Sequence, residues 1–364
     1  MKKILVVVGA RPNFVKVARL KAIAIERSPD LRIELVHTGQ HSAAEMTDVF
    51  FEQFGTRPDH FLQIAENTPV ARLGQMLIQL DRCMSEVKPD LVMVVGDVDS
   101  TLAGALAANR NGIRLAHLES GLRSFDLSMP EEVNRILVDR IADLHFVTEE
   151  SGRLNLQREG IAAEKIHLVG NTMIDALVAF ADRIEGSPIL QELGLDRGGH
   201  ILVTMHRPAT VDRREGLEKM LEVLETVSAE TTVIHPMHPR TRRQLENFGL
   251  LDRLASNERI RTIAPLDHFS FQKLLSTSSC VITDSGGVQE ETTFRQVPCI
   301  TLRANTERPV TVTEGTNRLM PLDPKAIAEA IGRIRDGLWP KGTIPQLWDG
   351  HATERVLEVL RRVI

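Results

Sequence analysis

The sequence predicts an α/β fold made of two doubly wound, Rossmann-like domains, each with a parallel sheet. Its 364 residues are too many for one ordinary hydrophobic core and suit two domains of typical size. Apolar runs of strand length alternate with stretches of helical spacing, which is the pattern of βαβ units. Strand candidates such as Leu91–Val95 are apolar throughout, as expected for a parallel sheet that helices cover on both faces.

The strand candidates fall into two series with a pause between them. The pause comprises Asn171–Arg183, which has helical spacing, and the turn Gly186-Ser187-Pro188. We therefore expect an N-terminal domain over residues 1–170 and a C-terminal domain over residues 171–350. The amphipathic segment 351–364 is expected to form a helix that packs back on the first domain. The first series is Ile4–Val8, Ile33–His37, Leu91–Val95, Leu115–Leu118, Leu144–Val147 and Ile166–Val169; the second is Ile201–Thr204, Thr232–Ile234, Ile260–Ile263, Cys280–Thr283 and Cys299–Leu302.

Composition excludes several classes of protein. The net charge is −5 and no basic stripe is present, which argues against nucleic-acid binding. No apolar run approaches the length of a membrane span. Gly9-Ala10-Arg11-Pro12 interrupts the apolar start too early for a signal peptide, so we expect a cytoplasmic protein. Cys83, Cys280 and Cys299 form no CxxC pattern and are expected to be buried thiols rather than disulfides or metal ligands.

Unusual polar residues gather where the predicted strands end. Ligands of doubly wound domains bind outside the carboxyl ends of the strands, so two such domains are expected to share a site in the cleft between them. This clustering at one edge of each sheet predicts an enzyme. The residues are Arg11, Gly39-Gln40-His41, Gly96-Asp97, Glu119, His206-Arg207, His238 and Asp284-Ser285-Gly286-Gly287.

The loop after the first strand, Gly9–Lys16, contains a single glycine. It therefore lacks the GxGxxG fingerprint, and we do not expect a nicotinamide cofactor. Arg11 and Lys16 are placed to reach a phosphate or sugar at the start of the first helix. The alternative is that both are surface residues of a solvated helix.

The first domain supplies carboxylates at neighbouring strand ends. Asp97 and Glu119 each follow a strand, and Glu131 and Glu132 open a helix after Pro130. Carboxylates packed together repel one another and raise the pKa of at least one of them, as a general acid near neutral pH requires. Two simpler interpretations stay open: Glu131 and Glu132 as partners of the helix dipole, and ion pairs with Arg123 or Arg135.

The second domain contains a turn suited to an anion, Thr283–Glu291. Its Ser285, Gly286 and Gly287 let the backbone approach a ligand closely and present N–H groups at a helix start. Glu291, one turn further on, suits ribose hydroxyls, and Arg308 is a candidate partner of a diphosphate. The alternative is a tight turn with an N-capping serine.

Two histidine motifs accompany these residues. His206 ends the first strand of the second domain and is expected to face the carboxylates. His235-Pro236-Met237-His238-Pro239 lacks a compact set of further ligands, so we expect no metal.

Nine motifs, taken together and in order, resemble the non-hydrolysing UDP-N-acetylglucosamine 2-epimerases. The resemblance covers about residues 4–320 and includes the closing helix. The motifs are GARPNFVK, TGQH, GDVDST, HLESGLRS, PEEVNR, VGNTMIDAL, TMHRP, DSGGVQEE and TERP.

The resemblance implies a GT-B fold, a homodimer, and reversible inversion at C2 of UDP-GlcNAc to give UDP-ManNAc, a precursor of surface polysaccharide. The family eliminates UDP to a 2-acetamidoglucal and adds it back, without metal, flavin or nicotinamide. By position, the catalytic residues are Asp97, Glu119, Glu132 and His206. The UDP-sugar contacts are Arg11, Lys16, Phe271, Ser285, Gly286, Gly287, Glu291 and Arg308, and the residues of a second, allosteric UDP-sugar site are Gln40, His41, Arg207 and His238.

The chain also departs from the commoner members. Pro208-Ala209-Thr210 stands where they have REN after the HR pair, Val98 stands for the threonine of GDT, and Leu266 for a glutamine. Ser42-Ala43-Ala44 does not continue the allosteric pattern. These departures leave open a related acetamido sugar or uronate as substrate. Three further classes of protein compete with this interpretation: a hydrolysing epimerase, an acceptor-dependent GT-B glycosyltransferase and a non-catalytic UDP-sugar sensor.

Overall fold

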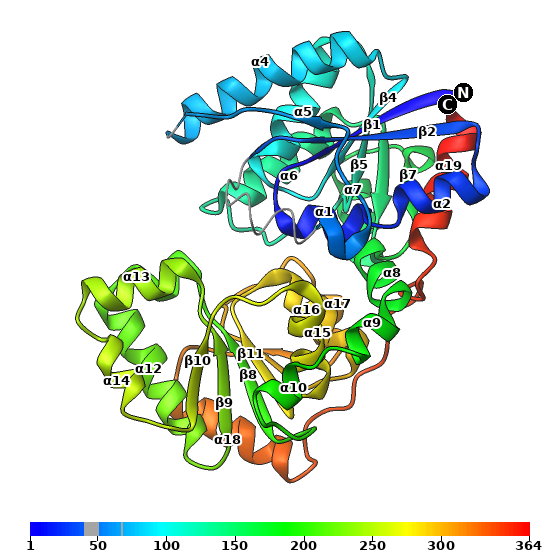
Figure 1. Ribbon diagram of the computed structural model, residues 1–364. Coiled ribbons are helices and arrows are strands. Elements are labelled where there is room, and N and C mark those ends of the chain that lie inside the picture. The colour runs from blue at the N-terminus through cyan, green and yellow to red at the C-terminus, as the bar shows by residue number, and fades with distance from the viewer. Residues whose placement is uncertain (40–50, 67) are drawn as a thin grey trace. The chain divides into compact units, whose positions relative to one another are not determined.

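The computed structural model describes residues 1–39, 51–66 and 68–364, except the side chains of Arg11, Ala209 and Ala255. Gln40 and His41, expected in an allosteric site, lie outside these ranges. The chain divides into two compact units (Figure 1). Unit 1 comprises Met1–Ala179 and Gln346–Ile364, and unit 2 comprises Phe180–Pro345. In the described part of the chain, no helix has the length and apolar character needed to cross a bilayer.

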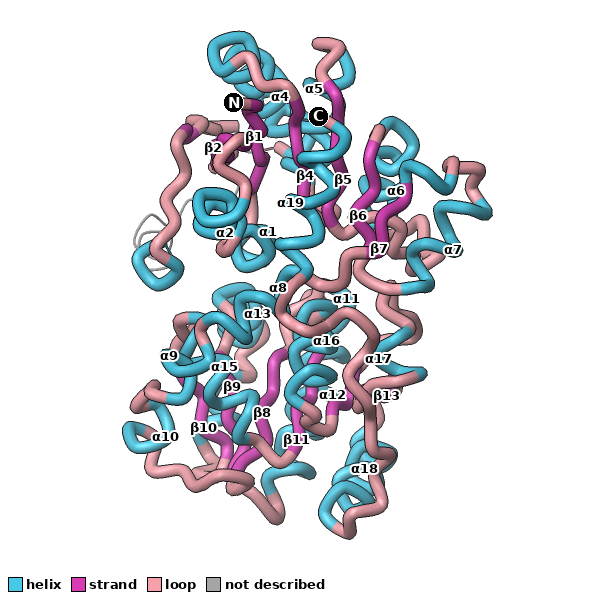
Figure 2. Tube along the Cα trace, turned by 90° about the vertical axis from the view of Figure 1, so that its right-hand side faces the viewer, coloured by secondary structure: helices cyan, strands magenta, loops and turns pink. Residues whose placement is uncertain are grey.

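Unit 1 is built on a parallel sheet of seven described strands in the order β3-β2-β1-β4-β5-β6-β7 (Figure 2). The strands are β1 (Lys2–Val8), β2 (Leu31–His37), β3 (His60–Phe61), β4 (Leu91–Val95), β5 (Arg114–Leu118), β6 (Leu144–Val147) and β7 (Ile166–Leu168). The helices are α1 (Arg11–Val17), α2 (Leu20–Arg27), α4 (Pro69–Val87), α5 (Asp99–Arg110), α6 (Pro130–Ile141), α7 (Glu150–Arg158), the 3₁₀ turn η1 (Ala163–Lys165), α8 (Thr172–Ala179) and α19 (Ala352–Val363).

Burial explains why the central strands of unit 1 are apolar throughout. Every residue of β4 is buried, and β1 is buried from Ile4 onward. Helices α4, α5 and α6 pack side by side on one face of the sheet, whereas α8 contacts α1 and α19, and α19 contacts α2. Strand β1 pairs with β2 on one side and β4 on the other, so the strand order reverses at this point. Doubly wound sheets bind ligands beside such a switch point.

Unit 2 repeats this design with a parallel sheet of six described strands in the order β10-β9-β8-β11-β12-β13. Consecutive residues of a strand alternate between two apolar clusters: Val203 belongs to one, with α12 and α18, and Leu202 to the other, with α15 and α16. The strands are β8 (His200–Thr204), β9 (Thr232–Pro236), β10 (Ile260–Ile263), β11 (Cys280–Thr283), β12 (Cys299–Thr301) and β13 (Asn317–Leu319). The helices are α9 (Ala181–Glu185), α10 (Ile189–Glu192), α11 (Pro208–Val211), α12 (Arg214–Ser228), α13 (Pro239–Asn247), α14 (Leu251–Ala255), α15 (His268–Thr277), α16 (Gly286–Arg295), α17 (Val310–Thr313) and α18 (Pro324–Arg335).

Two doubly wound parallel sheets confirm the predicted fold class, but the division of the chain differs in detail. It falls after Ala179 rather than after residue 170, and the chain returns to unit 1 at Gln346 rather than at residue 351. Helix α8 stays with unit 1 because its buried Asp175 accepts hydrogen bonds from the backbone N–H groups of Ala352 (3.0 Å) and Thr353 (2.5 Å) at the start of α19. The short edge strands β3 and β13 were not expected from the sequence.

Gly170 and Gly160 provide a matched pair for testing where α8 meets the returning chain. Both have left-handed backbones, with φ of 88° and 84°. A Cβ at Gly170 would lie 2.1 Å from the carbonyl oxygen of Leu347, whereas nothing lies within 4 Å of a Cβ at Gly160. Gly160→Ala should therefore cost only the conformational term, roughly 1–2 kcal/mol. Gly170→Ala must also displace a backbone segment.

We expect Gly170→Ala to lower the free energy of unfolding of unit 1 by about 2 kcal/mol more than Gly160→Ala does. The measurement is urea unfolding followed by fluorescence of Trp348, which is buried in unit 1 and donates its Nε1–H to the carbonyl of Thr148. A Trp339→Phe background removes the other tryptophan of the sequence. Equal losses in the two variants would contradict the expectation.

Candidate active site

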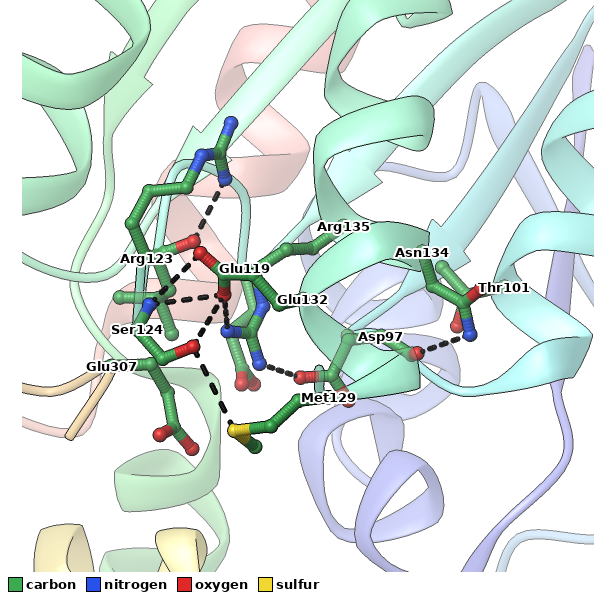
Figure 3. A network of polar contacts seen from close by, with 12 residues as sticks. Asp97, Thr101, Glu119, Arg123, Ser124, Met129, Glu132, Asn134, Arg135 and Glu307 are labelled. Carbon is green, nitrogen blue, oxygen red and sulfur yellow. Dashed lines mark hydrogen bonds and ion pairs between the residues drawn. The ribbon is translucent and has the colours of Figure 1, made fainter. Parts of the chain in front are cut away.

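Unit 1 brings two of the predicted carboxylates to adjacent strand ends. Asp97 follows β4 and Glu119 follows β5, and these strands pair with Val95 beside Leu118. Asn134 of α6 donates its amide to the carbonyl of Asp97 at 2.9 Å, which fixes the turn after β4. Figure 3 shows the side chains of this region. Two acidic residues therefore follow adjacent, paired strands, as the sequence predicts.

Arg135 joins two of the carboxylates directly. Its Nη2 pairs with Asp97 and its Nη1 with Glu132 (Figure 3). The Arg135 side chain is 3% exposed and that of Asp97 is 23% exposed. Asp97 is thus held by a buried cation while it keeps access to solvent and ligands.

Glu132 is fully buried and surrounded by donors. Its carboxylate accepts hydrogen bonds from the backbone N–H of Ser124 (2.9 and 3.1 Å), the hydroxyl of Ser124 (2.9 Å) and the N–H of Phe125 (2.9 Å). Glu131, its neighbour in the first turn of α6, is exposed. Of the two glutamates that the sequence left open, Glu132 is therefore the one that belongs to the network.

Glu119 pairs with Lys16, and both side chains are buried. Its φ of 69° lies in the left-handed region, which costs a non-glycine residue roughly 1–2 kcal/mol. Lys16, expected from sequence to reach a phosphate, here neutralises a carboxylate instead. Lys16 and Arg135 lie beside the three carboxylates and offset the mutual repulsion that the sequence predicts. The ion pairs with Arg135, which the sequence left as an alternative, are therefore present.

In unit 2, the predicted anion-binding turn joins β11 to α16. Ser285 occupies the N-cap of α16, but its side chain makes no capping hydrogen bond, so the interpretation as a capping serine does not hold. A Cβ on Gly286 would lie 2.7 Å from both the Arg308 guanidinium and the Glu307 carboxylate. Only glycine lets these two side chains approach the start of the helix.

Arg308 is buried between two carboxylates beside this turn. Its Nε lies 2.8 Å from Glu290, its Nη1 pairs with Glu307, and Glu307 also contacts Arg303 at 2.9 Å. The guanidinium that sequence assigned to a diphosphate thus has carboxylate partners in this structure. An incoming diphosphate would exchange with them for the same donors.

Glu291 is buried one turn into α16. Burial raises its pKa to about 8, with a further rise from Glu290 that a hydrogen bond from Gln272 and the charge of Arg295 oppose. The carboxyl group is therefore protonated at neutral pH and can donate a hydrogen bond to a hydroxyl. Phe271, the predicted contact on α15, is half-buried against the apolar cluster that contains Leu274.

Asp284 belongs to the predicted cluster of strand-end residues, but the sequence analysis assigned it no specific role. Its Oδ2 accepts hydrogen bonds from the backbone N–H groups of His206 (2.8 Å) and Arg207 (2.9 Å), and its Oδ1 lies 3.2 Å from His206 Nδ1. Burial opposes ionisation, but the hydrogen bonds and charge of His206 outweigh it and lower the pKa of Asp284. The carboxylate therefore orients the imidazole through Nδ1. Pairing of β8 with β11, which brings the two strand ends together, was the available signal.

The two histidines of the His235–Pro239 motif lie in different surroundings. His238 accepts a hydrogen bond from the N–H of Arg240 at 3.1 Å and stacks on His206 with ring centroids 5.3 Å apart. His235 is fully buried, and burial lowers its pKa to about 4. An allosteric role for Arg207 and His238 stays a prediction.

The fold and these strand-end groups define a GT-B-like enzyme with a parallel α/β sheet in each unit. The model of the family described as UDP-N-acetylglucosamine 2-epimerase matches residues 23–361. The chain belongs to this family of isomerases, which confirms the resemblance found from the motifs.

The names of similar proteins specify two different substrates. The UDP-N-acetylglucosamine 2-epimerase of Methanococcus maripaludis is 37% identical over 340 residues, 92% of each chain. The UDP-2,3-diacetamido-2,3-dideoxy-D-glucuronate 2-epimerase of Pseudomonas aeruginosa is 38% identical over 366 residues, 99% of this chain and 100% of its own. The crystal structure of Methanocaldococcus jannaschii UDP-GlcNAc 2-epimerase in complex with UDP-GlcNAc and UDP is similar with a TM-score of 0.90 and 35% identity, covering 99% of both chains.

The raised pKa of Glu291 predicts a pH effect on the stability of unit 2. The folded state keeps a proton that the unfolded state releases above the ordinary value of 4.5, so this group lowers stability progressively as the pH rises toward about 8. Glu291→Gln should remove that contribution and flatten the pH dependence of unfolding.

Urea unfolding between about pH 5 and pH 8 tests this expectation. The probe is Trp339, whose Nε1–H donates to the carbonyl of Thr316 in unit 2, in a Trp348→Phe background. Glu314→Gln, at an exposed position, controls for the loss of a carboxyl group. Parallel pH curves for wild type and Glu291→Gln would contradict the assignment.

Proposed function

We propose that this chain is a non-hydrolysing 2-epimerase that interconverts UDP-GlcNAc and UDP-ManNAc. The observation that carries the proposal is the pair Asp97 and Glu119 at adjacent strand ends, each beside a buried cation, in a chain of this family. The relative from Methanocaldococcus jannaschii, named for the same reaction, was crystallised with UDP-GlcNAc and UDP.

The proposed reaction is an elimination followed by an addition. A base removes the proton at C2, the bond between C1 and the diphosphate oxygen breaks, and UDP separates from a 2-acetamidoglucal. A proton then enters C2 from the opposite face, and UDP adds again at C1. Removal of the C2 proton without loss of UDP would be poor chemistry, because no adjacent carbonyl would stabilise the resulting carbanion. The scheme needs two acid–base groups and a firm hold on UDP.

The residues divide between these two tasks. Asp97 and Glu119 are proposed as the acid–base groups, and Glu132 supports them by fixing Arg135 against Asp97. His206, oriented by Asp284, is proposed to bind the leaving diphosphate through Nε2. The other UDP-sugar contacts proposed are Arg11, Lys16, Phe271, Ser285, Gly286, Gly287, Glu291 and Arg308, of which the protonated Glu291 suits the ribose hydroxyls.

A second candidate substrate has a specific observation in its favour. The Pseudomonas aeruginosa relative named for UDP-2,3-diacetamido-2,3-dideoxy-D-glucuronate is as similar to this chain as the relatives named for UDP-GlcNAc. Both substrates share the UDP group and the 2-acetamido group and would use the same elimination. They differ at C3 and C6, so turnover rather than UDP binding distinguishes them.

Further parts of the proposal follow the family resemblance. We expect a homodimer that works in the cytoplasm and supplies ManNAc units for surface polysaccharide. The three cysteines of the sequence are buried free thiols, as suits a reducing compartment. Size-exclusion chromatography with light scattering tests the dimer.

The first test is to incubate the protein with UDP-GlcNAc in deuterated water, without added metal or acceptor, and to follow the sugar signals by proton NMR. We expect an equilibrium mixture of the two UDP-sugars with deuterium at C2, because the proton that returns comes from solvent. Free ManNAc would reassign the chain to a hydrolysing epimerase. Exchange only with the diacetamido uronate would establish the second candidate, and no exchange with either sugar would refute an epimerase of these substrates.

Variants of the carboxylates test their roles in the same assay. Asp97→Asn and Glu119→Gln should lower kcat by about 100-fold or more, since each removes an acid–base group. Asp99→Asn is a matched control, because Asp99 lies two residues from Asp97 and its side chain is 30% exposed. We expect it to retain near wild-type turnover. Full activity of Asp97→Asn would remove Asp97 from the mechanism.

A further inference from the structure

A buried polar network lies beneath the strand ends that carry Asp97 and Glu119, and the proposed reaction does not use it. Its centre is Asp139 of α6, which is 1% exposed. Asp139 accepts hydrogen bonds from Ser120 Oγ (2.8 Å) and the N–H of Gly121 (3.1 Å), and it pairs with Arg123 Nη1 at 2.7 Å. Asp139 also contacts His145 Nδ1 at 3.8 Å and His117, which is completely buried on β5.

His117 makes two short hydrogen bonds, one from each ring nitrogen. Its Nε2 lies 2.8 Å from the carbonyl oxygen of Gly96, and its Nδ1 lies 2.6 Å from Asp139 Oδ1. A carbonyl oxygen can only accept, so Nε2 carries a hydrogen. Asp139 Oδ2 lies 2.7 Å from the guanidinium of Arg123 and accepts the N–H of Gly121, so Asp139 is a carboxylate and also accepts from His117. Both ring nitrogens of His117 therefore donate.

The two bonds of His117 reach both catalytic turns. Gly96 directly precedes Asp97, and its own φ of 67° marks the turn after β4. On the other side, Asp139 fixes Ser120 and Gly121, which directly follow Glu119. That turn is tight, because a Cβ on Gly121 would lie 2.4 Å from the carbonyl oxygen of Gly152. The left-handed backbone of Glu119 is held within these contacts.

We propose that His117 is a positioning residue that, as a buried imidazolium, links the turn carrying Asp97 to the turn carrying Glu119 and fixes their separation. The proposal rests on the proposed function in assigning catalysis to these two carboxylates. A neutral imidazole has one N–H and would lose either the Gly96 bond or the Asp139 bond. The other charged groups of the network are consistent with a positive charge on His117. Arg123 forms ion pairs with two carboxylates, those of Asp139 and Glu159, and His145 contacts Ser120 at 2.9 Å.

The charge state can be measured without any reference to activity. Wild-type protein labelled with ¹⁵N in histidine is examined by NMR at neutral pH, and the His117 signals are assigned with His117→Gln. We expect two protonated ring nitrogens for His117. One protonated and one unprotonated nitrogen would overturn the imidazolium link, whatever the enzyme turns over.

The positioning role is tested by kinetics with a matched control. His117→Gln can still donate to Gly96 but not to Asp139, and His117→Asn can approach only Asp139. Each should lower kcat about tenfold or more with KM changed less than about threefold, because misplaced acid–base groups affect the chemical step rather than binding. His200→Gln replaces an equally buried histidine of unit 2, bonded to the Leu274 carbonyl at 3.0 Å, and should keep kcat within about twofold.

These experiments distinguish a failure of the positioning role of His117 from a failure of the proposed epimerase function. Wild-type kcat in His117→Gln, or a rise in KM alone, would overturn the positioning role while leaving the epimerase assignment intact. Absence of C2 exchange in the wild type would refute the proposed function, and the NMR result would still decide whether His117 links the two turns. If the His117 variants do not fold, the His117 signals are assigned instead by substituting the other histidines one at a time, and the wild-type spectrum then remains the deciding measurement.

Discussion

The carboxylate cluster of unit 1 depends on one buried guanidinium. Arg135 pairs with Asp97 at the end of β4 and with Glu132 on its own helix, α6. Glu132 in turn accepts hydrogen bonds from the backbone N–H groups of Ser124 and Phe125, so the two ion pairs of Arg135 connect the end of β4, helix α6 and the loop between β5 and α6. Removing one partner of a buried pair typically costs about 3–5 kcal/mol, because the other charge is left uncompensated. The same contact therefore stabilises the fold and places Asp97.

Charged side chains of the candidate site residues in both units form ion pairs with other side chains when no ligand is bound. In unit 1, cations hold Asp97, Glu119 and Glu132; in unit 2, Glu290 and Glu307 hold Arg308. A buried charge without a partner is costly, so a site rich in charges is most stable when each is paired. On the proposed function, a UDP-sugar would bind by exchange, because its diphosphate would take donors that carboxylates occupy. Because the ligand would replace existing partners, each new contact would add little binding free energy, but the charged side chains stay ordered when no ligand is bound.

The sequence predicted those site residues whose position depends only on the order of strands and helices in a parallel sheet. Parallel strands bring their carboxyl ends to one edge, so Asp97 and Glu119 could be placed together without coordinates. It did not assign roles to His117 and Asp284, whose partners depend on which strands pair and how a helix lies over them. The prediction of Glu132 was left open by one residue for a similar reason, since helix rotation decides which of two glutamates is buried. The strands β3 (His60–Phe61) and β13 (Asn317–Leu319) escaped detection because neither lies in an apolar run of strand length, which was the pattern used to find the other strands.

Unit 2 keeps two acidic residues of one turn and helix in opposite protonation states. Asp284 ends the turn after β11, where N–H donors and His206 lower its pKa; Glu291 lies seven residues later, where burial raises its pKa to about 8. The ionised Asp284 can orient an imidazole, whereas the neutral Glu291 can bond hydroxyl groups without adding negative charge near a diphosphate. On the proposed function, these environments suit two different tasks: the ionised Asp284 lies beside a histidine, and the neutral Glu291 adds no negative charge near a diphosphate ligand.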